Sequence, residues 1–405
     1  MRKALLVFVL LLIITGTAHA SPLQANLIIE GQIKTDDQIN DADAAQILGI
    51  ASVINYQEID EKKCAPEIRS GKIKNCLGEY AEYFTPEEFK KNFSTWNGAP
   101  YGGIGVVVSI KNRTVFVENV KHEYSAFKAG VRDGDIIRGT KENGTETIFK
   151  GADLEEVNRA MLGKIFTSYT LLIIRGEEPL EVKVTRVLIH PQHVIPQNSL
   201  LPGAIGYIRI INWNGGTAEQ FNAVVHALRN LGAKKNLFDV RNNPGGLAID
   251  ALEAVTSWET DDNAPLVTKR GRLQKEEIIT RAVLQKNNLR VFPASLKDVP
   301  CAVLINKDSG SASEIFAGFL KMKGCHIIGD TSFGKGTIQY VIPLGSGAAF
   351  KLTAAEYFIG LDIKIDGVGI VPTLAVSNPE GWEMGDVAND FQLKAALKLL
   401  NEQYK

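Results

Sequence analysis

The sequence predicts a multidomain α/β protein. The chain has 405 residues, which is enough for two or three domains. Its 45% hydrophobic and 22% charged residues are typical of folded globular chains and exclude a mostly disordered one. Three patterns follow one another: a mostly helical region to residue 99, short strands with one helix over 100–187, and alternating strands and helices from about 200. The net charge of −1 and the lack of a Lys/Arg tract argue against a nucleic-acid partner.

The first 20 residues have the layout of a secretory signal peptide. Arg2 and Lys3 precede an apolar run over 4–14, and Ala18-His19-Ala20 provides a cleavage site. Eleven helical residues span about 16 Å, against roughly 30 Å of hydrocarbon, so we expect cleavage and no permanent membrane anchor. We therefore expect an exported protein, with the periplasm favoured over the extracellular space.

Export bears on the four cysteines, because disulfides persist in oxidising compartments. Cys64 and Cys76 lie twelve residues apart in a polar stretch, and we expect them to form a disulfide. Cys301 and Cys325 each begin an apolar run typical of a buried strand, and the sequence leaves open whether they pair or remain thiols. No CxxC spacing occurs, which argues against a zinc site.

Residues 21–99 are expected to be mostly helical. Apolar residues recur at helical spacing over 41–56. Thr85-Pro86-Glu87-Glu88 is a capping box, with threonine at the N-cap, proline at the first helical position and glutamate at the third. Nothing in this region suggests chemistry, so we interpret it as a helical cap.

Residues 100–187 resemble a PDZ domain. A glycine-rich loop precedes a strand that begins at Val106, a turn at 133–135 feeds a second apolar strand, and a helix is expected over 153–162. In the PDZ fold such a loop holds the C-terminal carboxylate of a peptide, which adds to the sheet as an edge strand. The resemblance implies a peptide-binding loop formed by Gly102, Gly103, Ile104 and Gly105.

The third region, 188–380, predicts a largely parallel sheet with helices on its faces, because apolar strands alternate with amphipathic helices. Strands are expected at 205–211, 237–240, 302–306, 326–329, 337–342 and 350–358. The segment 381–405 is expected to form a C-terminal helix.

Ser311 is a candidate nucleophile. It follows a buried strand and opens a helix, whose positive dipole end stabilises nearby negative charge. Ser311-x-x-Glu314 is also a capping box, which is the commoner role for a serine at such a position. A histidine base is not indicated: five of the six histidines lie outside the signal peptide, and none occurs in a recognisable motif.

Lys335 is the better candidate base. A lysine accepts a proton only when it is neutral, so burial must lower its pKa well below about 10.4. If the segment is extended, Gln339 lies on the same face and could hold the amine. A solvated Gly-Lys-Gly turn is the simpler interpretation. A phosphate loop over 329–335 is disfavoured, because Gly336 stands where Ser or Thr is needed and a strand, not a helix, follows.

Seven short motifs occur in order over nearly the whole chain. They are Tyr83-Phe84-Thr85-Pro86-Glu87-Glu88-Phe89, Tyr101-Gly102-Gly103-Ile104-Gly105, Gly206-Tyr207-Ile208-Arg209, Asp239-Val240-Arg241-Asn242-Asn243-Pro244-Gly245-Gly246, Ser311-Ala312-Ser313-Glu314-Ile315, Phe333-Gly334-Lys335-Gly336-Thr337-Ile338-Gln339 and Lys351-Leu352-Thr353. Together they resemble the carboxy-terminal processing proteases, also called tail-specific proteases. The resemblance implies a PDZ domain inserted before a ββα/βαβ core of the ClpP/crotonase type.

The resemblance also implies a serine protease with a Ser/Lys dyad. Ser311 would be the nucleophile, Lys335 the general base and Gln339 the partner that orients the lysine. Ser313 is the neighbouring alternative nucleophile. The substrates would be proteins or peptides with a free, apolar C-terminus.

The implied reaction is acyl transfer without a metal or cofactor. Its oxyanion hole would use the backbone N–H groups of Ala312 and of Gly245 or Gly246. Three other functions are considered, and one of them, a periplasmic chaperone, stays open as a side activity. A catalytically silent PDZ-containing binding or scaffold protein should lack Ser311 or Lys335, and both are present. A crotonase-like acyl enzyme would need neither the dyad nor a PDZ domain. The sequence leaves the natural substrate and a possible homo-oligomer undetermined.

Overall fold

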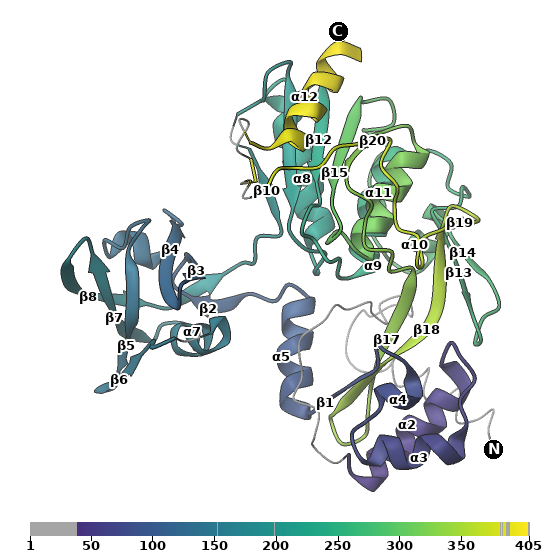
Figure 1. Ribbon diagram of the computed structural model, residues 1–405, viewed down its shortest axis with the longest axis horizontal. Coiled ribbons are helices and arrows are strands. Elements are labelled where there is room, and N and C mark those ends of the chain that lie inside the picture. Colours follow the sequence, from purple (N-terminus) through teal and green to yellow (C-terminus); the bar gives the residue numbers. More distant parts are fainter. Residues whose placement is uncertain are drawn as a thin grey trace. The chain divides into compact units, whose positions relative to one another are not determined.

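The computed structural model describes residues 39–403, except 152, 198, 381, 383 and 386–388 (Figure 1). The chain divides into two compact units: one combines residues up to Asn97 with those from Gln192 onward, and the other is Gly98–Pro191. The expected signal peptide lies outside the described residues. Among those residues, no helix has the length and apolar character needed to cross a membrane.

The first unit contains a mainly parallel six-stranded sheet, as the strand–helix alternation predicted. Neighbouring strands from β11 to β20 run parallel, and β10 is antiparallel to β11. The spatial order is β10 (Val194–Pro196), β11 (Ile205–Ile210), β12 (Lys235–Asp239), β15 (Cys301–Ile305), β16 (His326–Gly329) and β20 (Leu374–Ala375).

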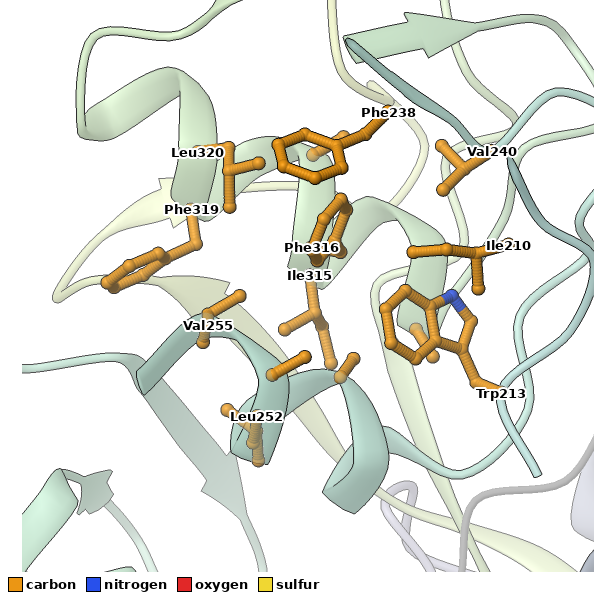
Figure 2. Packing of buried hydrophobic residues seen from close by; sticks show 14 of the residues in the cluster. Ile210, Trp213, Phe238, Val240, Leu252, Val255, Ile315, Phe316, Phe319 and Leu320 are labelled. Carbon is orange, nitrogen blue, oxygen red and sulfur yellow. The ribbon is translucent and has the colours of Figure 1, made fainter. Parts of the chain in front are cut away.

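Helices cover both faces of this sheet because its buried strands are apolar on both sides. One face packs against α8 (Thr217–Asn230), α9 (Ala248–Val255), the short η2 (Thr256–Trp258) and α11 (Ala312–Met322). The other packs against the C-terminal helix α12 (Phe391–Gln403), shorter than the predicted segment. Figure 2 shows Phe316 of α11 beside Phe238 and Trp213, with ring centroids 5.6 and 5.2 Å away. This packing fixes α11, whose first turn follows Ser311.

A second, antiparallel sheet is built around β18 (Ala349–Ile359). This strand pairs with β1 (Glu82–Phe84), β13 (Val267–Gly271), β17 (Thr337–Pro343) and β19 (Ile363–Lys364), and β13 pairs with β14 (Glu277–Ile279). The short helix α10 (Arg281–Lys286) follows β14. β18 therefore joins segments from the beginning, middle and end of the first unit.

The N-terminal helices pack on one end of this second sheet. They are α2 (Asp41–Ile54), α3 (Glu61–Arg69) and α4 (Lys74–Leu77). Ile47 and Ile68 share a buried cluster with Phe350 and Leu352 of β18. α5 (Pro86–Trp96) then begins with the predicted capping box, in which the Thr85 side chain and Glu88 bond to each other's backbone N–H. The region is helical, as expected, and belongs to the same compact unit as the sheets.

The second unit, Gly98–Pro191, has its own core and a five-strand path. Its order is β3 (Val106–Lys111), β4 (Thr114–Val120), β5 (Ile136–Glu142), β7 (Ser168–Arg175) and β8 (Glu178–Thr185), with β6 (Thr145–Ile148) on β5 and β2 (Tyr101–Gly103) paired with β9 (Val187–Ile189). Helices α6 (Ser125–Lys128) and α7 (Leu154–Met161) complete it. Buried Val117, Ile137 and Leu171 lie in its core.

Two disulfides are present. Cys64 pairs with Cys76, with Cα atoms 5.2 Å apart, and so connects α3 to α4. Cys301 pairs with Cys325, with Cα atoms 4.9 Å apart, a pairing that the sequence left open. The second bond ties the start of β15 to the residue before β16.

Candidate active site

Ser311 lies at the N-cap of α11 with an unusual backbone. Its φ of 54° and ψ of −116° are disfavoured for a side chain with a Cβ, and such strain is often kept at functional sites. The residue is 1% exposed, and its Oγ has no hydrogen-bond partner among the described residues. The hydroxyl therefore does not cap the helix. The other half of the predicted capping box does form, because Glu314 accepts from the Ser311 N–H at 2.8 Å.

Glu314 connects the serine to the loop that carries Lys335. One oxygen, Oε2, accepts the N–H groups of Ser311 and of Lys335, at 2.8 and 2.9 Å. The other, Oε1, accepts from the Gly334 N–H at 2.7 Å and from the Ser332 hydroxyl at 2.6 Å. Burial raises the pKa of Glu314, although these four donors oppose the rise. Sequence reasoning identified Glu314 only as a capping residue and missed this second role.

Lys335 is 6% exposed and lies against an aromatic ring from the N-terminal region. Its Nζ is 4.3 Å from the centroid of the Tyr80 ring, in the loop between α4 and β1. An ammonium over the face of a tyrosine is stabilised by the ring's negative face. The region that the sequence analysis interpreted as a helical cap thus contributes a contact to the candidate base, through Tyr80.

Gln339 lies on β17, and neither polar atom of its amide bonds to the side chain of Ser311 or Lys335. Lys335 precedes the first residue of the strand, Thr337, so strand alternation does not by itself place Gln339 on the face of Lys335. Its Nε2 donates to the hydroxyls of Thr337 and Thr353, at 3.0 and 3.3 Å. Its Oε1 is buried without a partner, like Ser311 Oγ.

Ser313 is held in a structural role. Its hydroxyl donates to the carbonyl of Asn243 at 2.9 Å and accepts from Trp213 Nε1 at 3.1 Å. A hydroxyl already engaged in both directions is a poor nucleophile, so the geometry favours Ser311.

The loop 243–246 meets the serine through Gly310, whose N–H donates to the Asn243 carbonyl at 3.0 Å. Of the two candidate glycines, Gly245 already donates its N–H to Asn243 Oδ1 at 2.9 Å. Gly246 remains the better oxyanion candidate. Gly246 has a φ of 143°, which disfavours any residue with a Cβ. A Cβ there would also lie 2.1 Å from the Trp213 carbonyl oxygen, so the position requires glycine. On the other side, Ala312 is the first residue of α11, where N–H groups lack intrahelical acceptors.

A buried ion-pair network anchors the same loop. Arg241 donates to Asp239 Oδ2 at 2.6 Å and to Asp390 Oδ1 at 2.7 Å, and all three side chains are fully buried. Bidentate pairs of this kind fix orientation as well as charge. The loop therefore leaves β12 from a rigid base.

Comparison with known proteins identifies the family. A peptidase family S41 model matches residues 204–376. A carboxy-terminal-processing protease from Bartonella bacilliformis is 31% identical over 373 residues, covering 88% of this chain and 81% of that protein. The chain belongs to this family of serine-type peptidases. A probable CtpA-like serine protease from Staphylococcus aureus is 30% identical over 368 residues, covering 90% of this chain and 70% of that one.

Solved structures support the S41 peptidase fold. The photosystem II D1 C-terminal processing protease covers 90% of this chain and 98% of its own, with a TM-score of 0.50 and 21% identity. A Bacteroides fragilis protein described as an S41 protease covers 92% and 99%, with a TM-score of 0.52 and 14% identity. At these identities the likeness concerns the fold alone.

In this S41 peptidase the phosphate-loop interpretation of 329–335 fails, as expected. Lys335 is followed by the strand β17 rather than by a helix N-terminus, which a phosphate would need.

The predicted peptide-binding residues lie in the other unit of the S41 peptidase, and only some of them form a loop. Gly102 and Gly103 belong to β2 and pair with Leu188 and Val187 of β9, whereas Ile104 and Gly105 connect β2 to β3. The carbonyls of Ile104 and Gly105 accept from Ala126 and Lys121, at 3.0 and 2.9 Å, which fixes the loop backbone. Gly105 has a φ of 83°, and a Cβ there would lie 2.2 Å from that of Tyr124. The loop leads into β3, which ends the strand path of its sheet. An edge strand of this kind has backbone groups to which an extended peptide can add.

Proposed function

We propose that this S41 peptidase is an endopeptidase that cleaves exported proteins near a C-terminal tail, with Ser311 as nucleophile and Lys335 as general base. The observation that carries the proposal is the strained Ser311, whose buried Oγ has no partner and whose N–H shares one carboxylate oxygen with that of Lys335. A low-dielectric site of this kind favours the neutral form of a lysine.

In the proposed reaction, neutral Lys335 takes the proton of Ser311 Oγ, and the oxygen attacks a peptide carbonyl carbon. The N–H groups of Ala312 and Gly246 stabilise the oxyanion. Protonated Lys335 then gives its proton to the leaving amine, which completes the acyl-enzyme. Water, deprotonated by Lys335, attacks the ester and releases Ser311 with its proton restored. No step needs a metal or cofactor.

The arrangement of Lys335 and Gln339 indicates how the site would become active. In the proposed reaction the lysine amine leaves the Tyr80 ring for Ser311, and Gln339 Oε1, which has no partner, would accept a hydrogen bond from it. Gln339 is thus proposed as the orienting partner that the resemblance implied.

We assign tail recognition to the unit Gly98–Pro191 as a PDZ domain. Gly102, Gly103, Ile104 and Gly105 would hold the substrate carboxylate, and the tail would add to β3. Val107 on β3, which is 44% exposed, favours an apolar tail.

The core of the other unit is proposed to be of the ClpP/crotonase type, on the basis of its parallel sheet with a helix that follows the nucleophile.

Export to the periplasm with removal of the signal peptide is part of the proposal. The two disulfides support it, because such bonds form in oxidising compartments.

The test is digestion of an unstructured protein that ends in an apolar tail, by wild type, Ser311→Ala, Lys335→Ala and Ser313→Ala. We expect cleavage by wild type and by Ser313→Ala, since that hydroxyl is structural, and loss of cleavage in the other two. The same substrate with an amidated C-terminus should be cut more slowly. Cleavage by Ser311→Ala would move the nucleophile elsewhere. A folded wild type that cuts neither substrate would favour the binding or scaffold function.

A further inference from the structure

Tyr357 connects the two proposed dyad residues through their backbones. The side chain rises from β18, is fully buried, and places its phenol oxygen 2.7 Å from the Lys335 carbonyl and 3.1 Å from the Ser311 carbonyl. A phenol has one proton, so it donates to one of these carbonyls at a time, and the shorter contact is to Lys335. Because burial raises the pKa of Tyr357 well above its usual value, the phenol keeps that proton.

The contact mirrors the one made by Glu314. A single carboxylate oxygen of Glu314 accepts both backbone N–H groups of Ser311 and Lys335, and the single phenol oxygen of Tyr357 reaches both of their carbonyls. The two side chains come from α11 and β18, which pack together in the core. One side-chain oxygen thus holds both N–H groups, and one phenol proton is available to the two carbonyls in turn.

Tyr357 reaches the site from β18, the strand that pairs with β17 just after Lys335. Its own N–H donates to the Gly336 carbonyl at 2.8 Å, so β18 holds the segment after Lys335 by main chain as well as by side chain. The Ser311 carbonyl already accepts the N–H groups of Glu314 and Ile315 in the first turn of α11, at 2.8 and 3.0 Å. The shorter phenol contact, to the Lys335 carbonyl, therefore ties the segment of the candidate base to the end of the helix that carries Ser311.

We propose that Tyr357 is a positioning residue, which sets the separation and orientation of Ser311 and Lys335 without touching the substrate. The inference rests on the proposed Ser/Lys function of this site. It predicts that loss of the phenol oxygen slows the chemical step while substrate binding is retained, because a misplaced nucleophile–base pair loses near-attack geometry.

The experiment compares Tyr357→Phe, which removes one oxygen, with Tyr83→Phe as the matched control. The Tyr83 hydroxyl also donates to a protein acceptor, Asp43 Oδ2 at 2.8 Å, but lies on β1 outside the proposed site. Kinetics on a quenched peptide and the rate of labelling by a fluorophosphonate, which reports Ser311 reactivity alone, are measured for full-length protein. We expect Tyr357→Phe to lower kcat about 10- to 100-fold, with KM within about 2-fold and labelling slowed in proportion. Tyr83→Phe should match wild type.

Three outcomes would overturn the assignment: wild-type kcat in Tyr357→Phe, a rise in KM with kcat kept, or a loss of rate that tracks the unfolded fraction in circular dichroism. Ser311→Ala is run in parallel. Cleavage that persists in that variant would refute the proposed function itself, whereas an inactive Ser311→Ala beside a fully active Tyr357→Phe refutes only the positioning role.

Discussion

Replacing Tyr80 by leucine is expected to make the peptidase active at lower pH. The Tyr80 ring lies 4.3 Å from Lys335 Nζ and stabilises the ammonium, whereas the proposed base must be neutral. Leucine removes the aromatic face but keeps an apolar side chain over the lysine, so the amine stays shielded from water. The change therefore isolates the electrostatic part of the contact.

The size of the expected pH shift follows from the burial of Lys335 and Tyr80. Lys335 is 6% exposed and Tyr80 is half-buried, which places the contact at about 1 kcal/mol within the range for cation–π pairs. That energy corresponds to a shift of the profile by about 0.7 pH unit, or about 5-fold higher kcat/KM on its rising limb.

The assay is kcat/KM for a quenched peptide between about pH 6 and 10. Tyr80→Phe is the matched control, because it keeps the ring and should follow wild type. A Tyr80→Leu profile that superimposes on wild type, or a Tyr80→Phe profile shifted equally, would refute the reasoning.

Three further predictions concern stability and the connection between Ser311 and Lys335. Glu314→Gln should reduce kcat and lower the free energy of unfolding by about 2–3 kcal/mol, because an amide nitrogen would face N–H donors that now meet a carboxylate oxygen. The rate of Ser311 labelling measures the first effect, and urea unfolding measures the second. Burial raises the pKa of Asp250 to about 7, above roughly 3.9 in the unfolded chain, so the folded protein keeps a proton that the unfolded chain loses. The free energy of unfolding should therefore fall by up to about 4 kcal/mol as pH rises from about 4 to 7. Urea unfolding of Asp250→Asn at several pH values should show no such fall. If the variant loses stability with pH as steeply as wild type does, the prediction is wrong. Replacing Cys301 and Cys325 by serine should cost about 3 kcal/mol, measured as a lower urea midpoint with unchanged activity of the folded fraction.

The parts of the site that the sequence could predict are those written in contiguous motifs. Ser311 and Lys335 were identified because each lies in a short segment with a glycine or helix signal around it, and both lie at the ends of elements near the Glu314 carboxylate. The parallel sheet was predictable for a similar reason, since strand–helix alternation is a local pattern.

The parts that escaped prediction depend on pairing between distant segments. Gln339 does not share a strand with Lys335, because β17 begins only at Thr337. Tyr80 reaches Lys335 from the N-terminal region, and Tyr357 reaches it from the next strand, 22 residues later. Their residue types carry no motif, so only the folded chain reveals them.

The position of β18 near the end of the chain has a consequence for biosynthesis. The N-terminal helices pack against this strand, and Tyr56 donates to Glu356 across 300 residues of sequence. At about 5–20 residues per second, the ribosome needs roughly 15–60 s to add those residues. Until then the strand against which α2–α4 pack has not been made, whereas the unit Gly98–Pro191 already contains all of its own strands and helices. A nascent chain that has passed Ser311 still lacks Lys335 and β18. Ser311, Lys335 and β18 can therefore come together only after the chain has been made as far as Ile359.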